Sequence, residues 1–492
     1  MIRNLTNALR RAPALRPTSH KPSIRCLSFQ SDFLNATSSL KSDGVTFQES
    51  ADRLRTLTKT NLLKPTDIRD APAKFFESHR LLARHAVTHG PGFWIRYTVH
   101  YNLFAGTVLA VGNDSQVNSL QKFQDEGLLG CFSLTEKLAG VQSGLVVQTT
   151  ATWDNAQKKF ILNTPTEGAR KNWISQGFTA DKTVVLADLI VGEKSRGPHA
   201  FLMDFRKKDG SLCDGITADD MGVKTVGNDL DNAWLSFDKV VLPHDALLSK
   251  YAEVDEASGE YNMKVKGVRP FDMIGQRLYT GRVAVAQAAL EYRRELFRRT
   301  KEYSDNKSTF AFKGSPVLSD IPQLTAIYKE NEEKQASLDA FVNSCELALS
   351  ECLKNSEPPS SKLVDAIATC KVRAVEESIS MCFRLKQEVG SFALMADAGF
   401  KHMDFLQCCK FAEGDSRILM QKMARDAMKS DVKTGGEGMS SEELRLCKAI
   451  GDGMAIALKE NGGDKGKAWD SEWVNVYALA EAVMKRVQSE VV

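Results

Sequence analysis

The 492-residue sequence predicts an α+β protein in which an N-terminal helical domain, a central antiparallel β-domain and a C-terminal four-helix bundle follow one another. The first observation is that short β-branched and aromatic runs, separated by polar turns, are confined to residues 127–245. The second is the helical spacing of apolar residues on both sides of that block. The third is that the segments after residue 265 are long and joined by short connections, which is typical of a bundle.

Composition argues against several classes of function. The chain has 65 basic and 62 acidic residues, and the resulting formal net charge of +3 does not indicate nucleic acid as a partner. No apolar run approaches the roughly 20 residues that a membrane span requires. The ten cysteines show neither a CxxC pair nor a zinc-like spacing with histidine, so we expect mostly small core residues and no metal site.

Residues 1–30 differ from the rest of the chain. Arginine and lysine occur there among Ser, Thr, Ala and Leu, with no acidic residue before Asp32. This composition is typical of a mitochondrial transit peptide, which we exclude from the fold. A disordered basic tail is the alternative interpretation.

Residues 31–126 are expected to form the N-terminal helical domain. Apolar residues recur at helical spacing from Phe75 to Val87, and Pro91-Gly92 interrupts the pattern. The four histidines of this region lack an accompanying carboxylate motif, so we interpret them as packing or surface residues rather than metal ligands. They are His79, His85, His89 and His100.

Residues 127–245 are expected to form the middle β-domain, the flavin-binding domain of the resemblance given below. The runs Val146–Trp153 and Lys158–Asn163 are rich in β-branched and aromatic residues, as strands are, and the polar residues between them suit a hairpin connection. Residues 251–268 are polar and are expected to form a solvent loop.

Residues 265–430 are expected to form the helical bundle, and residues 431–492 a helical tail. Each predicted helix has apolar residues at helical spacing, and proline-rich or glycine-rich stretches separate them. The bundle helices are expected from Phe271, over 321–353, over 363–395 and over 416–428, and the tail helices over 441–459 and 469–487.

Several segments of the chain, in order, match the motifs of one known family. They are Tyr101–Leu109, Gly130–Phe132, Thr149–Thr152, Phe160–Thr166, His199–Leu202 and Asp231–Trp234. Together with the domain order, they resemble the acyl-CoA dehydrogenase and acyl-CoA oxidase superfamily, and its oxidase branch more closely. The resemblance runs from about Phe75 to Met428. It implies an FAD-dependent oxidoreductase that converts an acyl-CoA thioester to a trans-2-enoyl-CoA, as in fatty-acid β-oxidation.

The resemblance assigns two motifs to the flavin. Thr135, in a Thr-Glu motif, would hydrogen-bond the ring, and Trp173-Ile174-Ser175 would place an indole against it and a hydroxyl near N5. This is chemically sensible, because a flavin needs one apolar wall and a few fixed donors. From the residues alone, a strand-end threonine and a core tryptophan are the alternative.

The resemblance also assigns the base. Glu413, in the segment Phe411–Gly414, would take the α-proton of the thioester while the β-carbon delivers hydride to flavin N5. An exposed glutamate, with a pKa of about 4.3, is too weak a base, so burial must raise the pKa. Gly414 would let the backbone approach the substrate closely. Without the family context, a glutamate before a glycine at a helix start is more often a helix cap or a partner of the helix dipole.

Three further assignments rest on weaker matches. Gly399 is what the segment Ala396–Phe400 keeps of the loop that receives the dinucleotide part of a neighbouring subunit's FAD. Gly140 is what remains of the glycine-rich loop after the Thr-Glu motif, and Arg282 falls where the family often has an arginine that contacts CoA. The altered 396–400 loop also permits a second hypothesis, a cofactor-poor family member that acts as an assembly or binding protein.

The implied partners are the acyl-CoA substrate, a second or further copy of the chain in a homodimer or homotetramer, and an electron acceptor. Oxidase-like residues favour O2, whereas a mitochondrial leader favours an electron-transfer flavoprotein. The C-terminal residues Ser489–Val492 are not a peroxisomal address of the Ser-Lys-Leu type. We therefore expect a dehydrogenase in the mitochondrial matrix, with an oxidase and the peroxisome as the alternatives.

Overall fold

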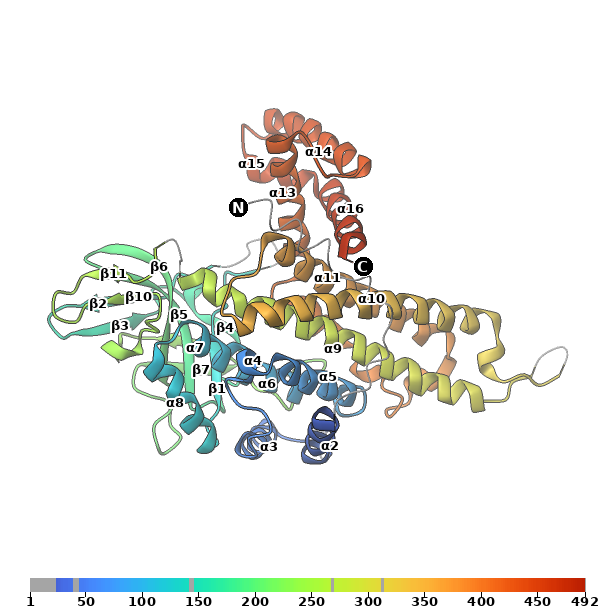
Figure 1. The fold of residues 1–492 in the computed structure, drawn as a ribbon, viewed down its shortest axis with the longest axis horizontal. Helices are drawn as coiled ribbons and strands as arrows, with labels where there is room; N and C mark the ends of the chain where they lie inside the picture. Colours follow the sequence, from blue (N-terminus) through green and yellow to red (C-terminus); the bar gives the residue numbers. More distant parts are fainter. Residues whose placement is uncertain (1–23, 39–43, 141–145, 267–269, 311–313, 492) are drawn as a thin grey trace.

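The computed structural model describes residues 24–38, 44–140, 146–266, 270–310 and 314–491. The β-domain lies at one end of the molecule, the long helices α9 and α10 extend away from it, and the N-terminal helices pack along one side of these (Figure 1). Helices α13–α16 stand on the other side. The predicted α+β architecture and domain order are confirmed.

The N-terminal domain is entirely helical among its described residues. Capping boxes fix two of its helix starts: Thr46 with Glu49, and Asn113 with Gln116. The bounds are α2 Ile24–Thr37, α3 Phe47–Lys59, α4 Asp67–Asp70, α5 Pro72–His89, α6 Gly92–Thr98, the π-helix η1 Val99–Ala105, α7 Gly106–Val111 and α8 Asp114–Asp125.

Helix α2 overlaps the predicted leader. Residues 1–23 lie outside the described part of the chain, but residues 24–30 begin α2. Phe33 on this helix is fully buried, and its ring packs edge-on against Tyr97 at 6.0 Å between centroids. Helix α2 therefore crosses the predicted boundary at residue 30.

The β-domain is built from three sheets. The largest has the order β1-β5-β2-β3-β9 with β6 on β5; a second has the order β4-β8-β7, and β10 pairs with β11. Most pairs are antiparallel, as predicted, but β5 runs parallel to both β1 and β2. The bounds are β1 Gly130–Ser133, β2 Thr150–Asp154, β3 Lys159–Asn163, β4 Lys171–Ser175, β5 Lys182–Val191, β6 Lys194–Asp204, β7 Ile216–Asp220, β8 Asn232–Phe237, β9 Val240–Pro243, β10 Ala252–Val254 and β11 Tyr261–Met263.

In the described part of the C-terminal half, the long helices α9, α10 and α11 pack on one another, and α9 and α10 also pack on α5. The fourth predicted bundle helix, α13, packs chiefly on α16 and so joins the tail (Figure 1). Their shared apolar core is continuous with that of the N-terminal domain. The bounds are α9 Pro270–Asn306, α10 Pro322–Lys354, α11 Ser361–Glu388, α12 Asp404–Phe411, α13 Ser416–Thr434, α14 Ser441–Glu460, α15 Lys465–Ser471 and α16 Trp473–Val491.

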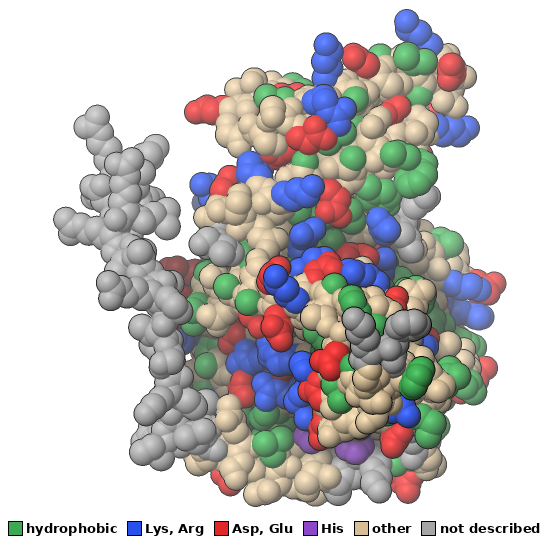
Figure 2. Space-filling view, turned by 90° about the vertical axis from the view of Figure 1, so that its right-hand side faces the viewer, with side chains coloured by type: hydrophobic (Ala, Val, Ile, Leu, Met, Phe, Trp, Pro, Cys, Tyr) green, Lys and Arg blue, Asp and Glu red, His purple; other side chains and the backbone are tan. Residues whose placement is uncertain are grey.

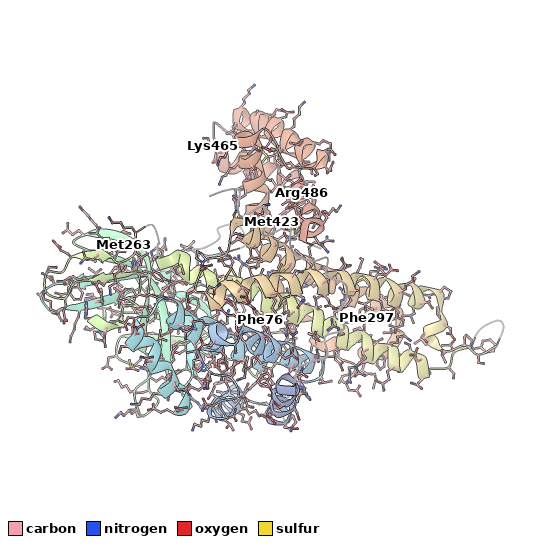
Figure 3. All side chains as sticks on the ribbon, in the orientation of Figure 1. Phe76, Met263, Phe297, Met423, Lys465 and Arg486 are labelled. Carbon is pink, nitrogen blue, oxygen red and sulfur yellow. The ribbon has the colours of Figure 1, made fainter. Side chains whose placement is uncertain are left out.

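The tail is fastened to itself by a buried ion pair. Arg486 on α16 (Figure 3) donates through Nε to both carboxylate oxygens of Glu443 on α14, at 2.9 and 3.1 Å. The Glu443 side chain is fully buried.

In the end-on view, acidic and basic side chains are interspersed (Figure 2). Within the described ranges, no helix combines the length and apolarity needed to cross a bilayer.

Candidate active site

Glu413 lies in the short turn between α12 and α13. Its φ is +58°, a left-handed value that is unusual for a residue with a side chain, and Gly414 follows at +93°. Asp415 then caps α13 by accepting from the Arg417 N–H at 2.7 Å. Such strained backbone persists only where the surroundings over-determine it, and it is concentrated at functional sites.

The carboxyl group of Glu413 is held away from water. Its Oε2 is buried and has no hydrogen-bond partner among the described residues, and Oε1 makes only a long contact of 3.5 Å with Asn102 Nδ2. Gly281 on α9 lies against the carboxyl group. Burial disfavours the charged form and raises the pKa of Glu413 to about 7, against the opposing charges of Arg282 and Lys371. A carboxylate with this pKa suits general-base catalysis near neutral pH.

Two cations grip the backbone around Glu413. Arg282 Nε donates to the Glu413 carbonyl oxygen at 2.9 Å. Lys371 Nζ, from α11, donates to the carbonyl oxygens of Lys410 and Gly414 at 2.5 and 2.9 Å. The predicted CoA-contacting residue Arg282 is thus hydrogen-bonded to the backbone of Glu413 in this structure, and a contact with CoA stays a prediction.

Thr135 and Trp173 lie beside each other at the edge of the β-domain. The Asn172 N–H donates to the Thr135 carbonyl oxygen at 2.8 Å, and Glu136 forms an isolated antiparallel bridge with Lys171. Trp173 adopts φ +57°, and 56% of its surface is exposed. Its backbone N–H donates to Met221 Sδ at 3.1 Å. The left-handed backbone thus holds a large indole outside the core. This placement suits contact with a ligand better than core packing.

The remaining predicted flavin residues fall on different sides of β4. Ser175 is two residues from Trp173 and is half-buried, with its Oγ accepting from Asn232 Nδ2 at 3.0 Å. Ile174 points the opposite way, into the β-domain core, with 2% exposure. Any contact of Ile174 with a ligand on the Trp173 side would therefore involve its backbone.

The glutamate of the Thr-Glu motif has a structural task that the sequence analysis missed. Glu136 and Lys171 form an ion pair at 2.9 Å in which both side chains are fully buried. Glu136 also accepts from the N–H groups of Gln148 and Thr149 at 2.7 and 2.9 Å. Burial lowers the pKa of Lys171 to about 8, with Glu136 opposing this shift. The pair fixes the segment that carries Thr135.

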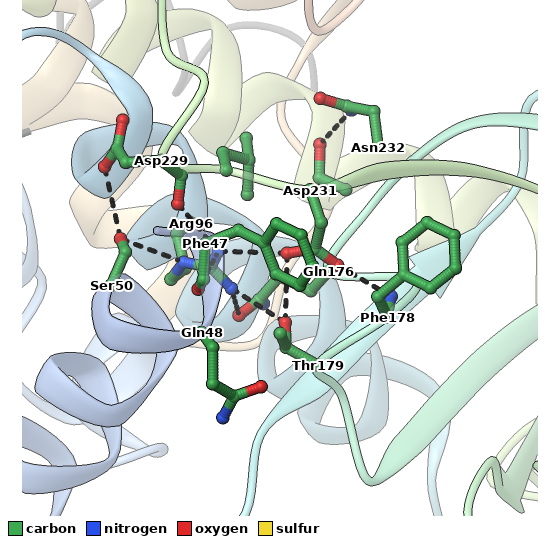
Figure 4. A network of polar contacts seen from close by, with 12 residues as sticks. Phe47, Gln48, Ser50, Arg96, Gln176, Phe178, Thr179, Asp229, Asp231 and Asn232 are labelled. Carbon is green, nitrogen blue, oxygen red and sulfur yellow. Dashed lines mark hydrogen bonds and ion pairs between the residues drawn. The ribbon is translucent and has the colours of Figure 1, made fainter. Parts of the chain in front are cut away.

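A second buried network fixes the segment after β4. Arg96 on α6 donates to Asp231 Oδ1 at 2.9 Å and to Thr179 Oγ1 at 2.8 Å, and its Nη1 lies 3.3 Å from Gln176 Oε1 (Figure 4). Asp231 also accepts from the Phe178 N–H at 2.6 Å. Both charged side chains are buried. The network therefore holds the residues that follow Ser175 against the N-terminal domain.

The β-domain edge and the base share one neighbouring element, η1. This π-helix packs on both β1 and α9. His100 Nδ1 accepts from the Gly130 N–H at 3.2 Å, and Asn102 reaches Glu413. A π-helix is rare and often occurs at functional sites. Asn102 belongs to a segment that carried the family resemblance, but the sequence analysis gave it no role.

The remaining predicted site residues are glycines. Gly414 is half-buried, and a Cβ there would stand 3.2 Å from Arg282 Nη2. Gly399, at φ +98°, packs against Val87 and Leu296, and Gly140 is exposed next to residues outside the described part. The assignment of Gly399 to a neighbouring subunit's cofactor stays a prediction.

The histidines of the N-terminal domain behave as packing residues where they are buried. His79 is fully buried, with Nδ1 at 2.8 Å from the Phe75 carbonyl oxygen and Nε2 at 2.8 Å from Thr98 Oγ1. Burial lowers the pKa of His79 to about 4 and that of His100 to about 3, so both are neutral at physiological pH. The described residues contain no cluster suited to a metal ion.

Comparison with known proteins gives a consistent result. No family model matches the chain. It is 26% identical over 344 residues to the mouse acyl-coenzyme A oxidase-like protein, covering 68% of this chain and 54% of the relative. It is 26% identical over 341 residues to Arabidopsis thaliana peroxisomal acyl-coenzyme A oxidase 3, covering 67% of this chain and 49% of the relative.

A solved structure shares the fold. Acyl-CoA oxidase-2 of Caenorhabditis elegans superposes with a TM-score of 0.75 at 18% identity, covering 94% of this chain and 75% of the other. The chain spans about half the length of the curated relatives it matches. These relatives, the domain order and the shared fold confirm the resemblance to the acyl-CoA dehydrogenase and acyl-CoA oxidase superfamily, and to its oxidase branch more closely.

Proposed function

We propose that this chain is an FAD-dependent acyl-CoA oxidase that introduces an α,β double bond into an acyl-CoA thioester, with Glu413 as the base. The observation that carries the proposal is the carboxyl group of Glu413: it is buried, its Oε2 has no hydrogen-bond partner among the described residues, and its pKa is raised to about 7. A cap or a structural glutamate needs none of these features, because it is stabilised by being charged and hydrogen-bonded.

The residues at the β-domain edge fit a flavin. Trp173 offers an exposed aromatic wall in strained backbone, and exposed Thr135 lies beside it. Ser175, two residues further along β4, is half-buried and carries a hydroxyl group. When bound, the flavin supplies the acceptor for the hydride that leaves the β-carbon. The related Caenorhabditis elegans oxidase contains FAD and ascaroside-CoA, which agrees with this fit.

Glu413 performs the proton step. As a carboxylate it accepts the α-proton of the thioester, and it is neutral after the transfer. Arg282 and Lys371 hold the turn so that the carboxylate stays directed toward Gly281 and Asn102. Water exclusion around Oε2 makes the charged base costly before the proton transfer, which raises its proton affinity.

The acceptor and the compartment follow the oxidase relatives. The sequence analysis slightly favoured a mitochondrial dehydrogenase over an oxidase. The relatives that the chain matches are acyl-CoA oxidases, however, and the Arabidopsis relative is peroxisomal. We therefore propose O2 as the final acceptor and the peroxisome as the compartment. A mitochondrial dehydrogenase is the second candidate, favoured only by the basic composition of residues 1–30.

The first experiment is a visible spectrum of the purified chain, followed by anaerobic addition of acyl-CoAs of graded length. We expect a flavin band that bleaches with the preferred acyl-CoA, and hydrogen peroxide once air is admitted. Glu413→Gln should keep the flavin band and lose the bleaching. A bleached enzyme that is reoxidised only by an electron-transfer flavoprotein would identify the dehydrogenase. A chain that stays colourless with added FAD would overturn the proposal and favour the assembly protein.

A further inference from the structure

We propose that Lys371 is a positioning residue for the base: its ammonium group locks the turn that carries Glu413 and sets the electrostatic environment of the carboxylate. This inference rests on the proposed function for its kinetic part, but its structural part does not. Lys371 lies on α11, and none of the motifs of the resemblance includes it.

All three donors of the Lys371 ammonium group are used on one turn. Nζ donates to the Lys410 carbonyl oxygen at 2.5 Å, to the Gly414 carbonyl oxygen at 2.9 Å and to Ser416 Oγ at 3.1 Å. The first acceptor precedes Glu413, and the other two follow it. Lys371 itself is fully buried. An ammonium group removed from water and satisfied by one turn stabilises that turn in a single conformation.

The turn needs such a lock because of its backbone. Glu413 at φ +58° is held in a sparsely populated region that costs on the order of a few RT per residue. The Lys410 carbonyl oxygen also lies in the last turn of α12, where carbonyls lack helical partners and a cation is favourable. Arg282 holds the Glu413 carbonyl from the opposite element, α9. Lys371 and Arg282 therefore clamp the residue from two helices.

Charge gives Lys371 a second effect. Burial raises the pKa of Glu413, and the positive charges of Arg282 and Lys371 both act to lower it. The groups that face Lys371 are Arg282 from α9, Cys409 from α12, Asp415 from the turn and Glu376 from its own helix. Burial lowers the pKa of Lys371 to about 7, so its charge and that of the base change over the same pH range.

The test compares three variants with the wild-type holoenzyme. Lys371→Met removes the donors and the charge, Lys371→Gln keeps donors without charge, and Lys334→Met is the control. Lys334 pairs with Glu330 and Glu377 on the outer part of the bundle. The readouts are kcat and KM for an acyl-CoA, the pH at which kcat falls on the acidic side, and amide hydrogen exchange of residues 410–416 in the protein without substrate.

We expect Lys371→Met to lower kcat by about 100-fold while KM changes less than about threefold, because the base is misplaced and not the substrate. Exchange at 410–416 should rise about tenfold or more. In Lys371→Gln the acidic limb of kcat should move to higher pH by roughly half a unit or more, since the neighbouring positive charge that favours the carboxylate is gone. Lys334→Met should match the wild type in all three readouts.

Two results would overturn the proposal. One is exchange at 410–416 that is unchanged in both Lys371 variants. The other is an acidic limb in Lys371→Gln that coincides with the wild type while kcat is retained, as for a lysine that only fills space. If Lys371→Met does not fold, Lys371→Gln alone is used for both the exchange measurement and the pH profile of kcat. A wild-type chain without flavin or turnover would defeat the proposed function, and the exchange readout would still decide whether Lys371 locks the turn.

Discussion

Gly281 lies directly against the carboxyl group of Glu413: a Cβ at position 281 would stand 2.2 Å from Glu413 Cδ and 2.4 Å from Oε1. Glycine inside a helix costs about 0.5–1 kcal/mol relative to alanine. Its presence in α9 is therefore explained by the space that the base occupies, and the two residues form a matched pair from elements 132 positions apart in the chain, counting from 281 to 413.

If Glu413 is the base as proposed, Gly281→Ala should abolish acyl-CoA oxidation without unfolding the chain. The methyl group must displace the Glu413 side chain, and a displacement of the base by about 1 Å costs roughly 100-fold in kcat. Steady-state kinetics and thermal unfolding measure the two effects. Gly275→Ala on the same helix is the control, because its Cβ meets no atom within 4 Å. Equal kinetics for the two variants would contradict this account of Gly281.

Glu413→Gln should stabilise the chain, and more so at high pH. The folded-state pKa of Glu413, about 7, lies above its ordinary value of 4.5, so its contribution to folding is present below pH 4.5 and is lost as the pH rises through 7. A shift of this size corresponds to about 3 kcal/mol at most. Glutamine does not titrate. We expect the unfolding free energy of the variant to gain on the wild type between pH 5 and pH 8.

The matched control for this titration is Glu442→Gln. Glu442 is exposed and paired with Arg445, which lowers its pKa. Its replacement should produce no gain between pH 5 and pH 8. A Glu413→Gln curve that runs parallel to the wild type over this range would show that the carboxyl group of Glu413 is not buried as described. Chemical denaturation at both pH values measures the difference.

Arg96→Met should destabilise the fold strongly. It leaves the buried carboxylate of Asp231 without its partner, and breaking a buried pair in this way typically costs about 3–5 kcal/mol. Arg298→Met is the control, because Arg298 is exposed and its pairs with Glu295 and Glu302 are worth about 1 kcal/mol or less. Urea unfolding measures both. Similar losses in the two variants would indicate that the Arg96 network is not essential to the domain junction.

Trp173→Ala should weaken flavin binding and leave the fold intact. The indole is more than half exposed, so its loss removes little buried area, whereas a flavin would lose its aromatic wall. We expect FAD affinity to fall about tenfold or more in a fluorescence titration. Trp473→Ala is the control, since Trp473 on α16 is exposed to a similar degree. Unchanged affinity in Trp173→Ala would remove the indole from the flavin site.

The sequence predicted the domain order well, because periodicity and turn residues are local signals. The hairpin β2–β3 and the helices α9, α10 and α14 agree with the predicted segments to within a few residues, except that α9 runs on to Asn306. The parallel pairing of β5 with β1 and β2 depends on contacts between distant segments, which no local pattern encodes. For the same reason α13 was assigned to the bundle, although it packs mainly on α16.

At the site, the sequence indicated Glu413, Thr135 and Trp173 because motifs carry them. The structure adds residues to the site that the sequence analysis did not assign to it. Lys371 is one of many lysines on helices, and nothing in the sequence around Asn102 indicated that it would contact Glu413. Gly281 directly precedes Arg282, and the sequence analysis assigned a role to Arg282 but not to Gly281. Their partners are brought close only by tertiary packing, so no spacing in the sequence could have revealed them.

The clamp on Glu413 also constrains how the chain folds. Its contacts join Asn102, Arg282 and Lys371 to the 410–416 turn, across separations of up to 311 residues. Such contacts form late, because loop-closure entropy opposes them until the intervening elements have docked. A nascent or partly folded chain therefore carries an ordinary, solvated glutamate, and Glu413 acquires the raised pKa that the proposed base needs only when the N-terminal helices and the long helices have assembled around it.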